Sequence, residues 1–155
     1  MRKIVCTVNA DQVNDEHKKE LQTALRANYA THLSASESLI IVWCELPTAQ
    51  GYTCYEHPSA SLFIIEAQAG LDQKNREQML AACAADCARI TGIALASLVL
   101  SVFDEAQFAR MMSANQQRRL SFIGRIRFGY HMVVSLLRSK VTRGLWVFNA
   151  NLGVS

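Results

Sequence analysis

A strand–helix–strand pattern occurs twice in the first 105 residues of this 155-residue chain. In each copy an apolar, β-branched segment precedes an amphipathic helix, and a second apolar strand follows. The expected segments are strands at 3–9 and 38–46 around a helix that starts after Asn14, and strands at 61–69 and 98–103 around a helix that starts after Asp72. Corresponding segments recur at almost the same offset, which predicts two copies of one β-α-β unit.

Both expected helices carry end signals and one apolar face. Asn14 and Asp72 can cap the helix N-termini with their side chains, and Gly92 can end the second helix. The apolar positions follow helical spacing: Leu21, Leu25, Tyr29 and Leu33 in the first copy, and Met79, Leu80, Cys83, Ala84, Cys87 and Ile90 in the second. A helix between two strands normally joins parallel neighbours, so each unit should contribute a parallel pair. Two known α+β folds have this order, and periodicity alone does not separate them.

Charge is divided unevenly along the chain. Residues 1–105 contain all 13 acidic residues and half of the 16 basic ones, whereas residues 106–155 contain the other basic residues and no acid. The basic part predicts a short helix after residue 103, a longer amphipathic helix at 121–142 and a closing strand at 145–152. We therefore expect a body at 1–105 and a basic C-terminal extension at 106–155 that packs on the body or on a neighbouring subunit.

The basic helix has other possible partners. Arg125, Arg138 and Arg143 could face the acidic body, or together with Lys140 they could hold the helix on an anionic membrane surface. Nucleic acid is the weakest partner, because no aromatic platform or helix-turn-helix pattern accompanies the arginines. The helix is too polar to span a bilayer, which needs about 20 apolar residues.

Local motifs separate the two folds. The junction EAQAGLDQKNREQML resembles the strand–Gly–turn–helix signature of the tautomerase superfamily, which includes 4-oxalocrotonate tautomerase and macrophage migration inhibitory factor. The first unit shows the matching VNDEHKKEL, and LIIVWCELP followed by Gly51-Tyr52 is similar to the family's strand, acid and aromatic loop. This resemblance covers about residues 1–105 and favours the tautomerase fold over the ferredoxin-like one. It implies a duplicated β-α-β unit with a four-stranded mixed sheet and two helices, plus a C-terminal helical basic extension, and a homotrimer.

The sequence departs from this family at the catalytic positions. The family uses an N-terminal proline as general base or acid, whereas here Arg2 follows Met1; so large a residue prevents the usual methionine removal, and we expect a primary amine at Met1. The family's Gly-Arg element, whose arginine binds a substrate carboxylate, is Gly70-Leu71 in the second unit and lies near Val13 in the first. Neither apolar side chain can hold an anion.

The candidate pocket consists of Met1, Arg2, Trp43, Glu45 and Tyr52. By resemblance only Tyr52 and Glu45 match family positions, and both have a structural alternative: Tyr52 as a loop residue packed on a neighbouring subunit, and Glu45 as a salt-bridged acid at an edge. Trp43 lies within an apolar strand and is better explained as a core residue. This pattern assigns no catalytic residue.

The cysteines and the absent motifs limit the chemistry further. Five scattered cysteines are typical of reduced thiols in a cytoplasmic protein, and the N-terminus lacks the apolar core of a signal peptide. Cys83 and Cys87 lie one helical turn apart without a histidine at ligand spacing, so they indicate core packing and not a metal site. The sequence contains no nucleotide-binding or metalloprotease motif, and we expect neither a cofactor nor a metal.

These observations leave three functions open. The first is a tautomerase-superfamily homologue without the catalytic proline, a non-catalytic or divergent trimeric protein that binds a small molecule. The second is a divergent isomerase or decarboxylase of small keto or enol acids, with the Met1 amine and Arg2 near its pocket. The third is a peripheral membrane or partner-binding module that uses the basic extension.

Overall fold

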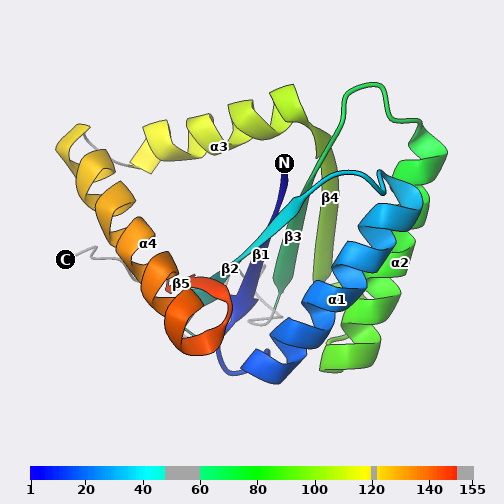
Figure 1. Cartoon of the computed structure of the whole chain (residues 1–155), viewed down its shortest axis with the longest axis horizontal. Coiled ribbons are helices and arrows are strands. Elements are labelled where there is room, and N and C mark those ends of the chain that lie inside the picture. The colour runs from blue at the N-terminus through cyan, green and yellow to red at the C-terminus, as the bar shows by residue number, and fades with distance from the viewer. Residues whose placement is uncertain (48–59, 120–121, 150–155) are drawn as a thin grey trace.

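A computed structural model of the chain describes residues 1–47, 60–119 and 122–149 (Figure 1). In chain order its elements are β1 (Arg2–Asn9), α1 (Asp15–His32), β2 (Leu39–Leu46), β3 (Ser61–Ala67), α2 (Gln73–Thr91), the short 3-10 helix η2 (Leu95–Ser97), β4 (Leu98–Asp104), α3 (Glu105–Arg119), α4 (Phe122–Arg143) and β5 (Trp146–Asn149). The predicted strands and helices of both units are confirmed. Their ends differ from the expected ones by one or two residues.

The strands form one mixed sheet in the order β4-β3-β1-β2-β5. β1 and β2 are parallel, β3 and β4 are parallel, and the two pairs meet through the antiparallel pairing of β1 with β3. The predicted α+β class with a duplicated β-α-β unit is therefore confirmed. The sheet has five strands and not four, because β5 adds a short parallel strand beside β2.

The two crossover helices begin and end as the sequence predicts. The side chain of Asn14 accepts a hydrogen bond from the His17 N–H at 2.8 Å, and that of Asp72 accepts one from the Asn75 N–H at 3.0 Å. Gly92 ends α2 with φ +70°, a left-handed conformation that favours glycine. Both units therefore use the same capping chemistry.

The core lies between α1, α2 and one face of the sheet. Ile4, Ile41 and Ile65 are fully buried on neighbouring strands, and the Trp43 ring packs edge-to-face on the Phe63 ring with centroids 6.4 Å apart. Burial of aliphatic and aromatic groups of this size is the main favourable term in folding. The core thus spans both repeated units and depends on their pairing.

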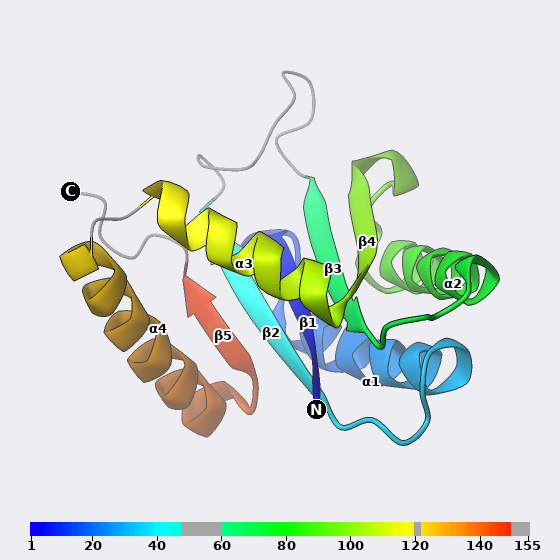
Figure 2. The same cartoon turned by 90° about the horizontal axis from the view of Figure 1, so that it is seen from above.

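The C-terminal extension adds Leu145 and Val147 to this core, whereas its two helices lie elsewhere. α3 starts at the end of β4 and runs on the side of the sheet opposite α1 and α2, and α4 passes outside the β5 edge (Figures 1 and 2). Ser139 Oγ joins α4 to β5: it donates to the Leu145 carbonyl at 2.9 Å and accepts from the Val147 N–H at 2.8 Å. Across the described ranges, no helix combines the length and apolarity needed to cross a membrane.

Replacing Leu25 with alanine should lower the free energy of unfolding by about 2–5 kcal/mol, because the side chain is almost completely buried between α1 and the sheet. Urea denaturation followed by circular dichroism measures the change. Thr23→Ala on the exposed side of the same helix is the control and should change stability by less than about 0.5 kcal/mol. Equal effects of the two substitutions would contradict this packing.

Candidate functional site

A cluster of charged groups surrounds Arg2 at the start of β1. Its guanidinium donates hydrogen bonds to Glu105 at 2.7 Å, to Glu37 at 3.3 Å and to Glu66 at 3.4 Å. The second oxygen of Glu66 accepts the backbone N–H of Lys3 at 3.1 Å. Three carboxylates from the loop before β2, from β3 and from α3 therefore share one cation.

These contacts shift the ionisation of the cluster. Hydrogen bonding to Glu105, followed by the charges of Glu105 and Glu37, raises the pKa of Arg2 against the opposing effect of burial. The pKa of Glu37 is lowered, first by a hydrogen bond from the Met1 amino group, which lies 3.2 Å from its carboxylate. Arg2 and Glu37 are thereby stabilised in their charged forms, and the contacts of the cluster form an ion-pair network.

Tyr29 contacts the backbone of Glu66 from the core side of this network. Its hydroxyl donates to the Glu66 carbonyl at 2.9 Å, and burial raises the pKa of this phenol to about 12. A phenol with such a pKa remains protonated near pH 7 and cannot act there as a base. Tyr29 therefore orients β3 and has no proton-accepting role in this state.

A second charged cluster lies at the opposite end of β2. Lys18 is almost completely buried, and its ammonium donates to the Val13 carbonyl at 2.6 Å and to Glu45 at 2.7 Å. Arg143 at the end of α4 bonds the same Glu45 carboxylate at 2.7 Å and 3.2 Å, and it also bonds Asp15 in a bidentate manner. These ion pairs hold the end of α4, which belongs to the basic extension, against the acidic first turn of α1.

The pKa values of both carboxylates are lowered. For Asp15 the main cause is hydrogen bonding to Arg143; for Glu45, burial acts in the opposite direction but hydrogen bonds from Arg143 and Lys18 outweigh it. A hollow of about 280 Å³ adjoins this cluster between α4 and β5, lined by Glu45, Arg138 and Arg143 among others. Of the lining cations, Arg143 is bonded to the carboxylates of Asp15 and Glu45.

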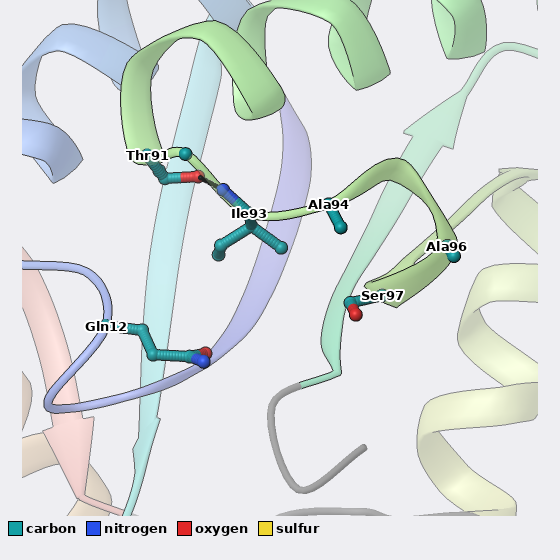
Figure 3. A pocket seen from close by; sticks show the side chains of 7 residues that line it. Gln12, Thr91, Ile93, Ala94, Ala96 and Ser97 are labelled. Carbon is teal, nitrogen blue, oxygen red and sulfur yellow. Dashed lines mark hydrogen bonds between the residues drawn. The ribbon is translucent and has the colours of Figure 1, made fainter. Parts of the chain in front are cut away.

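A cleft of about 550 Å³ lies at the end of the sheet away from Arg2. Figure 3 shows Gln12 on one side and the segment from Thr91 to Ser97 on the other, with the Gln12 amide pointing into the space between them. Gln12 Oε1 is buried and has no hydrogen-bond partner within the described part of the chain. The described lining contains no ionisable side chain, so the cleft can bind a polar molecule but offers no acid–base chemistry.

The sequence comparisons and the structural comparisons give different answers. No protein-family model and no curated protein matches the sequence. Solved structures do match: a fused 4-OT wild-type asymmetric trimer at 21% identity and TM-score 0.59, covering 66% of this chain and 85% of that one. FG41 malonate semialdehyde decarboxylase matches at 14% identity and TM-score 0.53 over 66% and 82%, and Leishmania major MIF2 at 13% and 0.57 over 67% and 88%.

The chain has the tautomerase fold. This result confirms the resemblance on which the fold prediction rested, and it favours the pseudo-two-fold arrangement over the ferredoxin-like one. Identities of this size establish the shared fold alone.

Within this tautomerase fold, the predicted pocket residues lie at separate places. Met1 and Arg2 are at the start of β1, whereas Glu45 is near the end of the parallel strand β2, opposite Val8. Six residues of strand separate these positions, or about 20 Å. Trp43 is fully buried in the core, and Tyr52 lies outside the described residues. Glu45 forms the salt bridges of its structural alternative.

The four cysteines within the described residues take no part in either cluster. Cys6, Cys83 and Cys87 are buried in the core, and burial raises the pKa of the Cys83 and Cys87 thiols to about 12. Cys83 Sγ lies 3.9 Å from Met79 Sδ, as packing on one helix face predicts. In the described ranges no group of three or more metal-binding side chains occurs.

Several residues of the charged clusters were not singled out from the sequence. Glu66 is the lone acid in the apolar strand SLFIIEA, and Lys18 falls beside the apolar positions of α1, so both interrupt a pattern that could have identified them. Glu37 and Glu105 lie in ordinary polar segments. The pairing of β1 with β2 brings Glu37 to Arg2, whereas the pairings of β1 with β3 and of β3 with β4 bring Glu66 and Glu105 there.

Replacing Arg143 with methionine should lower the free energy of unfolding at pH 7 by about 1–3 kcal/mol, because Glu45 loses charge-assisted hydrogen bonds. Carboxylates with a lowered folded-state pKa stabilise the fold above their unfolded pKa and lose this contribution as pH falls through the folded value. The difference between wild type and variant should therefore narrow below about pH 5. Urea denaturation at several pH values measures it.

Arg138→Met is the matched control for this prediction. Arg138 is exposed one turn earlier on α4, and its replacement should change stability by less than about 0.5 kcal/mol. A stability difference for Arg143→Met that stays constant down to pH 3 would contradict the assigned ion pairs.

Proposed function

We propose that this chain is a non-catalytic tautomerase-fold protein that binds a small molecule and associates with copies of itself as a homotrimer. The observation that carries the proposal is the engagement of Arg2 by Glu37, Glu66 and Glu105 at the end of the sheet where the superfamily keeps its catalytic nitrogen. A fused 4-OT with this fold is described as a trimer, which supports self-association here.

The chemistry at this edge argues against proline-type proton transfer. The Met1 amino group is bonded to the Glu37 carboxylate at 3.2 Å, so this contact would have to break before the amine could face a substrate. The positive charge of Arg2 is offset by three carboxylates, so a substrate carboxylate would meet repulsion as well as attraction. Leu71 follows the turn glycine and supplies no second cation.

The cleft beside Gln12 is the better binding site. Its buried acceptor Gln12 Oε1 needs a donor, because burying a polar atom without a hydrogen bond costs free energy. A small hydroxyl-bearing molecule, such as the enol form of a keto compound, supplies that donor. A volume of about 550 Å³ is within the range of small-molecule sites.

An enzyme that is a divergent isomerase or decarboxylase of small keto or enol acids remains the second candidate. It is favoured by the exposure of Glu105, whose side chain is 68% accessible, because this ion pair can open more easily than the one with Glu66. Arg2 and the Met1 amine would then face a substrate together. Peripheral binding to an anionic membrane through the basic extension is a third.

Wild-type protein should ketonise phenylenolpyruvate no faster than buffer does, and Glu105→Gln should not change this result. Under the enzyme candidate the same substitution would free Arg2, so it would raise kcat/KM several-fold over wild type. Ultraviolet absorbance of the enol follows the reaction, and intact mass establishes whether Met1 is present in the preparation assayed.

Glu77→Gln is the control for the change in net charge, since Glu77 is exposed on α2 and lies away from Arg2. Ketonisation above buffer by the wild-type protein would overturn the non-catalytic proposal. Activity in Glu105→Gln but not in Glu77→Gln would establish the enzyme candidate in its place.

A further inference from the structure

The exposed large apolar side chains of the described residues gather at two opposite edges of the sheet. Apart from Met1, they lie either on α4 or just before and within β4. Those on α4 are Ile126, Tyr130, Val133, Val134, Leu137 and Val141, which we call the α4 outer stripe. Those at the other edge are Leu95 and Val99, with 61% and 50% exposure, which we call the β4 edge patch.

α4 is apolar on two opposite sides. Phe128, Met132 and Leu136 are half-buried on its inner side, where Ser139 bonds β5. The outer stripe follows helical spacing on the other side, and Val141 within it is 87% exposed. Helices that are apolar on both sides are normally buried, and isolated helices with glycine and β-branched residues are unstable in water. The outer stripe therefore needs a cover that the described residues of one copy do not supply.

The β4 edge patch lies at the far end of the sheet from this helix. The strand order places β4 and β5 at opposite edges, and Figure 2 shows α4 beyond β5 on one side and β4 on the other. The two apolar patches of one chain are therefore too far apart to meet each other. Patches at opposite edges can meet only between copies, in a head-to-tail contact.

The positive charge of α4 disfavours a symmetric contact, in which the α4 helices of two copies would pack against each other. Arg138 and Lys140 flank the outer stripe, and residues 106–155 contain no acid, so two such helices would bring cations together without a counter-charge. All acidic residues belong to the body. Asp104 and Glu105 lie at the end of β4.

The lengths of the two elements fit this pairing. A helix of 22 residues is about 33 Å long and a strand of 7 residues is about 23 Å long. An α4 that covers Leu95 and Val99 therefore also reaches the acidic end of β4.

We propose that copies of this chain associate head to tail, with the α4 outer stripe of one copy packed against the β4 edge patch of the next. The proposal deepens the self-association given above and rests on that part of the proposed function. It commits to a second copy because a membrane would engage α4 alone and would leave Leu95 and Val99 uncovered. A head-to-tail contact of this kind closes into a ring when the rotation between copies permits it.

Size-exclusion chromatography with light scattering tests the surface. Wild type should have a molar mass that is a multiple of 17.3 kDa, and Leu137→Glu, Val141→Glu and Val99→Glu should each dissociate to monomer at the same concentration. Thr142→Glu is the matched control for Val141→Glu, since it adds the same charge at a neighbouring exposed position outside the stripe. Unchanged circular dichroism establishes that each variant is folded.

Mixing two variants distinguishes a head-to-tail contact from a symmetric one. Leu137→Glu keeps the β4 edge patch and Val99→Glu keeps the outer stripe, so one intact contact forms between them, and the mixture should contain a one-to-one dimer. Two monomeric variants that remain monomeric on mixing would overturn the head-to-tail assignment.

Other results of these experiments would replace or overturn the proposed head-to-tail contact. A monomeric wild type that pellets with phosphatidylserine vesicles would replace the proposal with membrane binding, and a monomer that does not pellet would overturn it without replacement. If wild type is oligomeric but Leu137→Glu and Val99→Glu keep its mass, this surface is wrong while self-association stands. None of these results depends on the ketonisation assay, so the failure of either proposal is recognised separately.

Discussion

The antiparallel pairing of β1 with β3 is the contact on which the rest of this structure depends. It joins two β-α-β units, each of which is internally parallel, and it places α1 and α2 side by side on one face. The helices then contact each other, as the hydrogen bond between Asn28 and Asp86 at 2.9 Å illustrates. Without this pairing neither unit could bury its apolar strand faces, because one helix covers only part of a sheet.

The same pairing determines where the charges meet. Because β1 and β3 run in opposite directions, the start of β1 lies beside the ends of β3 and β4. Arg2 is thereby surrounded by Glu66 and by Glu105 at the start of α3. The start of β1 is thus occupied by an ion-pair network, and the uncharged cleft lies at the other end of the sheet. The charged network and the uncharged cleft are thus separated by about the length of a strand.

The repeated units could be predicted because their signals are local. Caps at Asn14 and Asp72, the ending glycine Gly92 and the apolar spacing each act within one turn or strand. The candidate pocket grouped Glu45, which matches a family position, with Arg2, which stands where the family has proline; the structure places these two residues about 20 Å apart along parallel strands. The carboxylates around Arg2 come from segments far apart in the chain, and no local pattern connects them.

The sequence by itself determined the two β-α-β units, the division into an acidic body and a basic extension, and the absence of proline beside Met1, because composition and short-range spacing carry these properties. Only the tertiary structure decided that Arg2 is bound by three carboxylates, that Arg143 fastens α4 to α1, and that the α4 outer stripe and the β4 edge patch face away from the core. The physical reason is that ion pairing and burial depend on distance in space. Strand pairing sets this distance, and sequence separation does not.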